Sequence, residues 1–329
     1  MKNDAPVRLG DEPWFWREAG LAASLARALL TPAAIIYDAA QRARALATKP
    51  ITADIPVICI GNATLGGVGK TPFAIALKQL LEPEVGPIAF LTRGYGGALR
   101  GPVRVETRAT ARDVGDEALL LARTGPTIVS KNRPEGARLA VSNGAQLIIM
   151  DDGFQNPTLA KDVTVLLKSE TPPANASVFP AGPYREPSPR AEARADVVVT
   201  IGRDARLAPT QEALASAAQI GPVLAFCGVG RPHRFAATLK EAGYDVHDFI
   251  EFPDHHPFTD QEIRTLKSKA EKTGVQLITT EKDSVRLSPD QRQNIAVLPV
   301  SMHITAGPAL KTTILGLLDE RRPGWRPDA

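Results

Sequence analysis

The sequence predicts an α/β protein with a three-layer α/β/α core, a second, smaller α/β lobe and an N-terminal amphipathic helix. From Ile55 onward, short apolar runs rich in β-branched residues alternate with helix-length segments, and a second such series begins near Gly221. Near-continuous apolar runs are typical of parallel strands that are buried on both faces. The chain has 329 residues, which exceeds the ~250–300 residues at which a single core stops growing.

The composition is that of a globular protein, with 43% apolar and 23% charged residues. A net charge of +3 is too small to suggest nucleic acid as a partner, and nothing in the sequence indicates an obligate protein partner. Cys59 and Cys227 lie in predicted strands, so we expect them to be small core residues in a reducing compartment. The longest uncharged stretch near the N-terminus, Ala28–Tyr37, is about half of what a membrane span needs, so no crossing is predicted.

The first fifty residues combine an aromatic cluster, Pro13-Trp14-Phe15-Trp16, with leucines and an isoleucine near helical spacing. Thr31-Pro32 is predicted to end one helix and start another, because proline fits the first turn of a helix but not its interior. An amphipathic helix of this kind suits a bilayer interface. Packing on the protein's own sheet is the alternative, and Glu18, which falls among the leucines, favours it.

The core is predicted from six strands and three helices. The strands are expected at 55–60, 88–91, 127–129, 147–150, 163–167 and 197–201, and the helices at 70–81, 116–123 and 134–143. The second series predicts strands at 223–227, 244–252, 276–280 and 295–300 and helices at 232–242, 260–273 and 307–321. We therefore predict an N-terminal segment over residues 1–50, a first lobe over 51–220 and a second lobe over 221–329.

Residues 57–72 read Val-Ile-Cys-Ile-Gly-Asn-Ala-Thr-Leu-Gly-Gly-Val-Gly-Lys-Thr-Pro, which is an apolar strand, a glycine-rich turn and the start of a helix. In such a loop the backbone N–H groups face an anion, a lysine contacts the β- and γ-phosphates and a hydroxyl binds Mg²⁺. Lys70 and Thr71 occupy these two positions. Thr64 stands where the general motif has glycine, and an incidental glycine-rich turn is the alternative. The first lobe is therefore predicted to be P-loop NTPase-like.

Paired aspartates, Asp151 and Asp152, end the strand predicted at 147–150. This is where a nucleotidase holds Mg²⁺ opposite the hydroxyl of the phosphate loop, although a strand-ending aspartate can also be only a turn cap. Gln155 follows and would lie beside the metal. Arg93 follows another parallel strand, so it is a candidate to stabilise the transferring phosphoryl group; a surface arginine in a glycine turn is the alternative.

Three further groups of charged residues are less specific. Asp116 and Glu117 open a predicted helix and are compatible with a simple interaction with its dipole. Asp254-His255-His256 places two histidines next to an acid; a histidine poised by a carboxylate is the usual proton acceptor from an alcohol, and a metal site is conceivable. Thr279-Thr280-Glu281-Lys282-Asp283 could contact an anion or form a solvated turn.

Taken together, these motifs resemble the tetraacyldisaccharide 4'-kinases, the lipid A 4'-kinases of Gram-negative envelope biogenesis, over nearly the whole chain. The signatures are Gly-Asn-x-Thr-x-Gly-Gly-x-Gly-Lys-Thr-Pro, Arg-Gly-Tyr-Gly, Gly-Asp-Glu, Asp-Asp-Gly-Phe-Gln, Pro-Ala-Gly-Pro-x-Arg-Glu-Pro, Phe-x-Asp-His and Thr-Glu-Lys-Asp, and all occur in this order. Thr64 is normal in that family, whereas Tyr184 and Ser284 replace the more frequent leucine and alanine.

The resemblance implies transfer of the γ-phosphoryl group of ATP to the 4'-hydroxyl of a tetraacyl glucosamine disaccharide 1-phosphate. It also implies a monotopic enzyme on the cytoplasmic face of the bacterial inner membrane, which favours membrane contact by the N-terminal helix. Asp116 and His255 would form a dyad that accepts the sugar proton, while Arg93 and Asp152 would line the reacting phosphate. The implied Mg-ATP ligands are Thr64, Gly66, Gly67, Val68, Gly69, Lys70, Thr71 and Gln155, with Thr71, Asp151 and Glu117 at the metal.

Two other classes compete with this interpretation. A membrane-surface ATPase switch shares the Gly-Gly-Val-Gly-Lys-Thr sequence, but such proteins carry a second lysine where this chain has Leu65. A lipid-binding adaptor with a degenerate nucleotide site is disfavoured because Lys70, Thr71 and Asp151 are all present.

Overall fold

The computed structural model describes residues 13–326. The chain divides into two compact units. The larger unit comprises residues 35–172, 184–208 and the C-terminal part from Val300, and the smaller one comprises residues up to Ala34, 173–183 and 209–299. The boundaries predicted at residues 50 and 220 stay sequence-based predictions.

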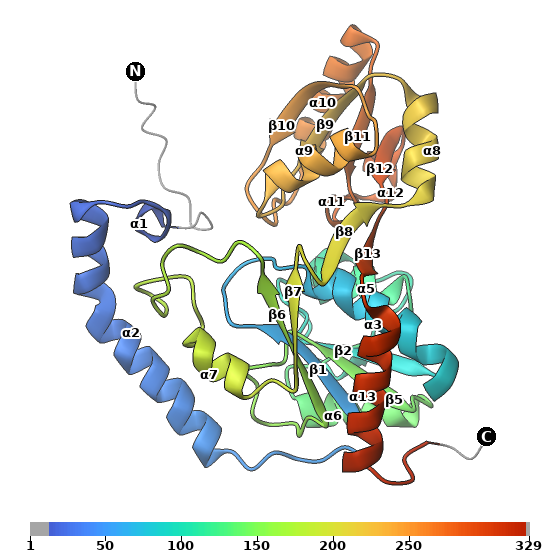
Figure 1. The fold of residues 1–329 in the computed structure, drawn as a ribbon. Coiled ribbons are helices and arrows are strands. Elements are labelled where there is room, and N and C mark those ends of the chain that lie inside the picture. The colour runs from blue at the N-terminus through green and yellow to red at the C-terminus, as the bar shows by residue number, and fades with distance from the viewer. Residues whose placement is uncertain (1–12, 327–329) are drawn as a thin grey trace. The chain divides into compact units, whose positions relative to one another are not determined.

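A nine-stranded sheet forms the centre of the larger unit (Figure 1), in the order β13-β8-β7-β6-β1-β5-β2-β4-β3. The pairs from β6 to β4 are parallel, and β3 is antiparallel to β4. The predicted buried parallel sheet is thus confirmed. Its strands are β1 (Val57–Asn62), β2 (Ile88–Thr92), β3 (Val103–Arg104), β4 (Thr127–Val129), β5 (Leu147–Asp151), β6 (Val163–Ser169), β7 (Val197–Ile201), β8 (Ala205–Pro209) and β13 (Val300–Ile304).

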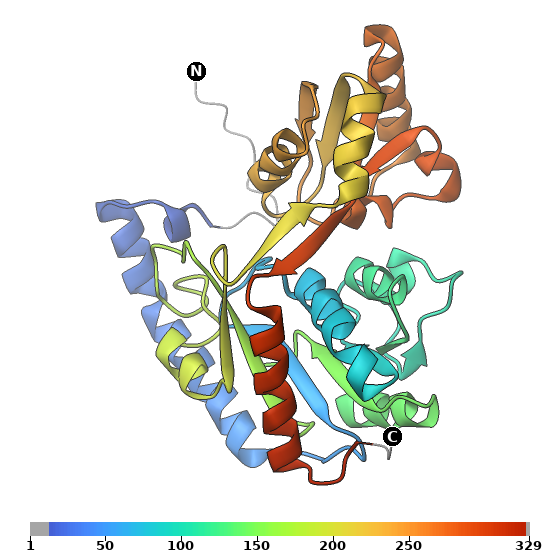
Figure 2. The same cartoon turned by 45° about the vertical axis from the view of Figure 1, so that its right-hand side comes forward.

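Helices cover both faces of this sheet, as Figures 1 and 2 show. On one face Phe73 of α3 and Ile314 of α13 pack with Phe90 of β2 in the main core. On the other face Gly136 of α6 lies so close to Leu91 that an added Cβ would be 2.6 Å from Leu91 Cδ1. The predicted three-layer α/β/α core is therefore present. The helices are α3 (Lys70–Val85), α4 (Ala111–Val114), α5 (Asp116–Ala122), α6 (Arg133–Ser142), α7 (Ser188–Ala193) and α13 (Gly307–Arg321).

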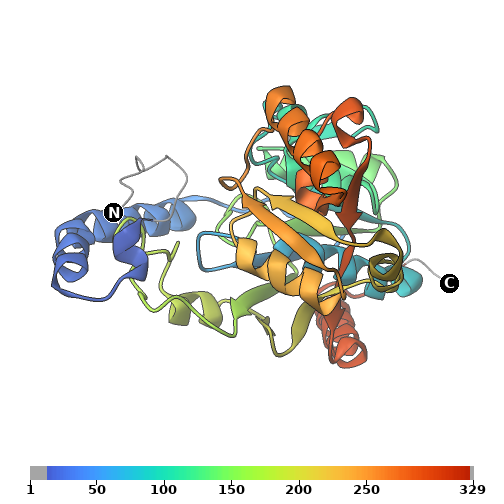
Figure 3. The same cartoon turned by 90° about the horizontal axis from the view of Figure 1, so that it is seen from above.

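The smaller unit contains a four-stranded parallel sheet in the order β10-β9-β11-β12. Figure 3 shows α10 on one side of this sheet and α8 and α9 on the other. Leu224 and Phe226 of β9 pack with Ile263 and Leu266 of α10. The elements are α8 (Gln211–Ile220), β9 (Val223–Cys227), α9 (Pro232–Glu241), β10 (Val246–Glu251), α10 (Asp260–Thr273), β11 (Gln276–Thr280), α11 (Glu281–Ser284), α12 (Pro289–Arg292) and β12 (Ile295–Leu298).

One predicted strand, over residues 295–300, is wrong. The segment splits at Pro299 into β12, which pairs with β11, and β13, which belongs to the nine-stranded sheet. Proline has no N–H to donate to a ladder and therefore interrupts a strand.

The prediction that Thr31-Pro32 divides the N-terminal helix is also wrong. Helix α2 (Leu21–Ala47) runs through Pro32 without a break and follows the short helix α1 (Trp14–Arg17). The hydroxyl of Thr31 donates to the carbonyl of Arg27 at 2.9 Å within the helix. Strong helix formers, mostly alanine and leucine, flank the proline on both sides, and their favourable propensity offsets its cost. Glu18, which favoured packing, lies before α2 rather than among its leucines.

Helix α2 is long and apolar enough to cross a membrane by length and composition alone. The uncharged stretch Ala28–Tyr37 is shorter than the apolar part of this helix. Helix α2 has 27 residues, and from its start to residue 38 only Arg27 and Asp38 are charged. Its leucines and isoleucines are largely exposed, with Leu29 at 81%, whereas Ala23 and Ala34 on the opposite side are buried. The helix therefore presents an uncovered apolar face.

Candidate active site

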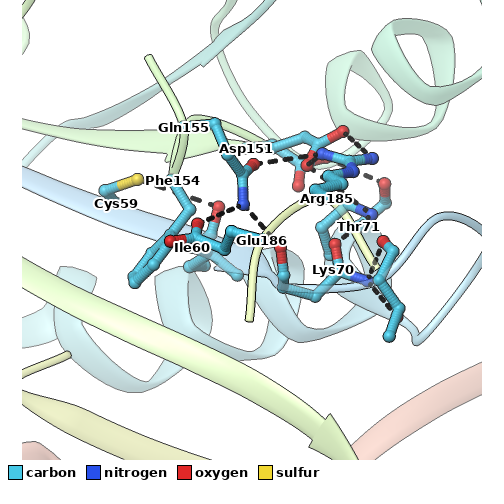
Figure 4. Close-up of polar contacts among 12 residues, drawn as sticks. Cys59, Ile60, Lys70, Thr71, Asp151, Phe154, Gln155, Arg185 and Glu186 are labelled. Atoms are coloured by element: carbon cyan, nitrogen blue, oxygen red, sulfur yellow. Dashed lines mark hydrogen bonds and ion pairs between the residues drawn. The ribbon is translucent and has the colours of Figure 1, made fainter. Parts of the chain in front are cut away.

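The glycine-rich turn between β1 and α3 presents Lys70 and Thr71 at the carboxyl edge of the sheet (Figure 4). Gly66 and Gly69 have φ values of 96° and 102°, which residues with a Cβ rarely adopt. The side chain of Lys70 is buried, and its Nζ donates to Asn62 Oδ1 at 3.2 Å. The lysine charge is thus held inside the turn, where an anion bound by the loop would meet it.

Thr64 contributes to the internal bonding of the turn. Asn62 Nδ2 donates to the carbonyl and hydroxyl oxygens of Thr64 at 2.8 and 3.0 Å. Thr64 also forms an isolated antiparallel bridge with Tyr184, and the backbone N–H of Arg185 donates to the carbonyl of Ala63 at 2.7 Å. A glycine at position 64 could not supply the hydroxyl, which explains why the departure from the general motif is compatible with an ordered loop.

Asp151 ends β5 directly beside β1, since its register partner is Ile60. Its Oδ2 accepts a hydrogen bond from Thr71 Oγ1 at 2.8 Å, but its Oδ1 is buried without a hydrogen-bond partner. Burial, followed by the negative charges of Glu117 and Asp152, raises the pKa of Asp151 to about 7. A buried acceptor that lacks a partner costs free energy, so this carboxylate is prepared for a cation.

Asp152 has a different environment. Its backbone is left-handed, with φ at 52°, and its two oxygens accept from Arg185 Nη1 and Nη2 at 2.7 and 3.1 Å. Lys70 Nζ lies 3.7 Å from Asp152 Oδ1. Burial favours the neutral acid, but the charges of Lys70 and Arg185 outweigh it, so the pKa of Asp152 is lowered. Asp152 is therefore an ionised residue that holds two cations at the phosphate loop.

Gln155 links Arg185 to Glu186 and to the end of β1, as Figure 4 shows. Its Nε2 donates to the carbonyl of Asn62 and to Glu186 Oε1, both at 3.0 Å, and its Oε1 accepts from Arg185 Nη1 at 3.3 Å. Glu186 is buried and accepts two bonds of 2.6 Å from Arg194 Nη2. The side chain of Gln155 thus bridges the end of β1 and the segment that carries Arg185.

The turn after β2, which carries Arg93, packs against the start of α5, which Asp116 opens. An added Cβ on Gly115 would be 2.2 Å from the carbonyl oxygen of Tyr95, so only glycine allows this close approach. The side chain of Arg93 is exposed, whereas Asp116 is buried and its Oδ1 accepts from the backbone N–H of Glu117 at 2.9 Å. The turn and the helix start thus place an exposed cation and a buried carboxylate on the larger unit.

The adjacent histidines His255 and His256 of the smaller unit differ in their contacts. His256 Nε2 lies 3.0 Å from both carboxylate oxygens of Glu262, and its ring stacks on Phe252 with centroids 4.9 Å apart. His255 has a left-handed backbone with φ at 59°, and its Nε2 lies 3.2 Å from Lys282 Nζ. Because an ammonium group has no lone pair to accept with, Lys282 donates and His255 Nε2 accepts. His256 is therefore used in packing, while His255 Nε2 lies beside Lys282 Nζ and, at 3.8 Å, Asp254 Oδ2.

Sequence reasoning did not assign roles to Asn62, Arg185 and Glu186. A signal was present, because Arg185 and Glu186 stand in a proline-rich motif whose fixed φ angles indicate an ordered loop. Oppositely charged neighbours with little exposure are unusual in such a loop. Only the folded chain shows that this segment lies against the phosphate loop, through the bridge to Thr64 and the bond to Ala63.

Comparisons with known proteins show the family to which the chain belongs. The family model for LpxK, tetraacyldisaccharide-1-P 4'-kinase, matches residues 26–319. A tetraacyldisaccharide 4'-kinase of Hyphomonas neptunium is 42% identical over 311 residues, which cover 88% of this chain and 92% of the relative. The corresponding protein of Parvibaculum lavamentivorans is 46% identical over 296 residues, which cover 84% of this chain and 86% of the relative.

A solved structure shares the fold. The "apo" form of LpxK from Aquifex aeolicus in complex with ATP matches with a TM-score of 0.72 and 26% sequence identity, covering 88% of this chain and 99% of that one. Sequence and structure thus match over most of the length, and the chain belongs to the tetraacyldisaccharide-1-P 4'-kinase family.

Proposed function

We propose that this protein is an ATP-dependent kinase that transfers the γ-phosphoryl group to the 4'-hydroxyl of a tetraacyl glucosamine disaccharide 1-phosphate in lipid A biosynthesis. The observation that carries the proposal is the juxtaposition of the phosphate loop with Asp151, whose Thr71-bonded carboxylate keeps one buried oxygen without a partner. The names of the relatives and the ATP in the Aquifex structure support the same activity.

Thr71, Asp151 and Glu117 are the residues that we expect to hold Mg²⁺. Among residues 13–326 no group of three or more His, Cys, Asp or Glu side chains forms a closed metal site. Mg²⁺ is usually bound by one or two carboxylates together with phosphate and water oxygens, so the Thr71 hydroxyl and the free oxygen of Asp151 fit it. Bound Mg²⁺ would neutralise charge on the β- and γ-phosphates.

The remaining nucleotide contacts come from the loop itself. The backbone N–H groups of Thr64, Gly66, Gly67, Val68 and Gly69 would surround the phosphates at the positive end of α3, and Lys70 would contact the β- and γ-phosphates. Gln155 borders this site. Arg93 would stabilise charge on the γ-phosphoryl group as it transfers. Phosphoryl transfer depends mainly on such positioning and charge neutralisation.

The acceptor hydroxyl needs a base, and His255 together with Asp116 is our candidate dyad. His255 Nε2 lies next to the carboxylate of Asp254 at 3.8 Å, and a histidine beside a carboxylate suits a group that takes a proton. Asp116, a buried carboxylate, would stabilise the imidazolium that forms. The glutamate contact of His256 supports the choice of His255 over its neighbour.

Membrane contact is proposed for the exposed apolar face of α2. Leu21, Leu25, Leu29 and Ile36 are 56–81% exposed and recur at helical spacing, so they form one stripe. The opposite side of the helix carries Ala34, which is buried, and Asp38, which is bonded to Arg190. A helix with one face held by the protein is suited to lie in the interface, here on the cytoplasmic face of the inner membrane, where ATP is available.

A direct test is to incubate the purified chain with Mg²⁺, ATP and the disaccharide 1-phosphate lipid, and to locate the new phosphate by mass spectrometry and ³¹P NMR. The proposal predicts a 4'-phosphorylated product with the wild-type chain and none above background with Lys70→Ala. A product phosphorylated elsewhere, or equal product with the variant, would refute it.

A further inference from the structure

A bidentate ion pair joins α2 to the segment that carries the arginine of the active site. Asp38 Oδ1 and Oδ2 accept hydrogen bonds from Arg190 Nη1 and Nη2 at 2.5 and 2.9 Å. The two side chains are only 18% and 34% exposed, and the hydrogen bonds and charge of Asp38 raise the pKa of Arg190. Two parallel hydrogen bonds between a guanidinium and a carboxylate fix the relative orientation of the two side chains as well as their distance.

Arg190 belongs to α7, and the chain just before α7 reaches the phosphate loop. Arg185 forms the two-bond contact with Asp152, and Glu186 is buried against Gln155 and Arg194. Pro187 and Pro189 occupy the stretch between Glu186 and Arg190. Because proline fixes φ, a displacement of Arg190 passes along the chain to Arg185 instead of being absorbed by backbone rotation.

Helix α7 has a second, independent attachment, so the pair with α2 is not its only support. Lys168 of β6 donates to Glu192 Oε1 at 2.8 Å, and Ser188 donates to the same oxygen at 2.8 Å. These contacts hold α7 to the sheet. Loss of the ion pair between Asp38 and Arg190 should therefore let α7 shift relative to α2 without unfolding, because the contacts of α7 with β6 remain.

We propose that Asp38 and Arg190 are positioning residues of the kinase reaction, because their ion pair transmits the placement of α2 through α7 to Arg185 and so to Asp152. This inference rests on the proposed function. The helix proposed to contact the membrane would then also set the position of Arg185, acting through Arg190 and α7. Arg185 in turn orients Asp152 through its two hydrogen bonds.

The test compares Asp38→Asn and Arg190→Gln with a matched control, Arg42→Gln, which removes a charge from the exposed surface of the same helix. A bidentate, partly buried pair is strong enough that kcat with saturating Mg-ATP and lipid should fall about tenfold in both variants. The control should stay within about twofold of wild type, as surface substitutions usually do. The exchanged pair, Asp38→Arg with Arg190→Asp, should recover most of the loss.

Two further measurements separate positioning from a merely structural role. Hydrogen exchange of the peptide covering residues 184–194 should accelerate in Asp38→Asn but not in Arg42→Gln. Vesicle binding and the KM for lipid should remain within about twofold of wild type, because the exposed stripe is unchanged. The inference would be overturned if kcat and exchange in both single variants matched wild type, or if the loss of kcat came together with weaker vesicle binding and a raised KM for lipid.

The proposed function fails in a different way. Absence of a phosphorylated lipid with the wild-type chain would overturn the kinase assignment and the inference with it. Failure of the wild-type chain to bind vesicles would overturn the proposed membrane contact of α2. In that case, a tenfold loss of kcat in Asp38→Asn and Arg190→Gln, measured with lipid in detergent micelles, would still support the positioning role of the ion pair.

Discussion

Replacing Asp151 with asparagine should stabilise the nucleotide-free protein at pH 8 while it abolishes kinase activity. The Asp151 carboxyl is fully buried, and burial and the charge of Glu117 raise its pKa from 3.8 to about 7. Between these values the folded state binds a proton that the unfolded state does not, so the contribution of this group to stability is full below the unfolded pKa and is lost as the pH rises through the folded pKa. Asparagine removes this titration.

The magnitude follows from the shift. From pH 5 to the folded pKa of about 7 the wild-type chain should lose about 3 kcal/mol through this group, since each unit is worth about 1.4 kcal/mol. The amide of asparagine would place a donor where Oδ1 has no partner, which costs about 1–3 kcal/mol. The cost of the unpaired amide does not depend on pH. The difference in the mutational effect on the unfolding free energy between two pH values therefore reports only the titration of the Asp151 carboxyl.

The assay is urea unfolding at pH 5 and pH 8 without Mg²⁺ or nucleotide. The change in unfolding free energy caused by Asp151→Asn should be more stabilising at pH 8 than at pH 5 by about 3 kcal/mol. Asp245→Asn, at an exposed position, is the matched control and should differ between the two pH values by less than about 0.5 kcal/mol. An equal effect of Asp151→Asn at both pH values, or a more stabilising effect at pH 5, would refute the reasoning.

Three other substitutions test separate parts of the site. Arg185→Lys keeps the charge but cannot form both bonds to Asp152, so kcat should fall roughly 10–100-fold, and steady-state kinetics that match wild type would contradict this. His255→Ala should cost roughly 10²–10⁴ in rate at saturating ATP and lipid, whereas His256→Ala should mainly lower the thermal unfolding midpoint; the reverse pattern would assign the base to His256. Leu29→Ser should leave stability unchanged but weaken vesicle flotation about tenfold, and unchanged flotation would remove Leu29 from the membrane face.

Much of the larger unit could be predicted because local and long-range preferences agree there. The strands Thr127–Val129 and Val197–Ile201 have the predicted bounds, since runs of β-branched residues favour strands. The two cysteines lie buried in strands, as expected. The phosphate loop and the paired aspartates meet because parallel strands bring their carboxyl ends to one edge.

The missed features depend on pairing across long stretches of sequence. Strand β8 and helix α8 were not predicted, although Thr210 caps α8 by accepting from Ala213 N at 3.2 Å and could have signalled its start. The role of Arg185 depends on a bridge between Thr64 and Tyr184, which no local pattern encodes. The continuity of α2 through Pro32 depends on the summed propensity of 27 residues, which a rule about one proline overlooks.

If this chain is a lipid kinase, its ATP turnover depends on a lipid acceptor. This dependence is measured as ADP formation by the purified wild-type chain with Mg-ATP, in the presence and absence of the disaccharide 1-phosphate lipid, with labelled phosphate followed into the lipid. We expect one labelled lipid for each ADP and only background turnover without acceptor. Equal ADP formation in both conditions, with no label in the lipid, would contradict it and favour an ATPase switch.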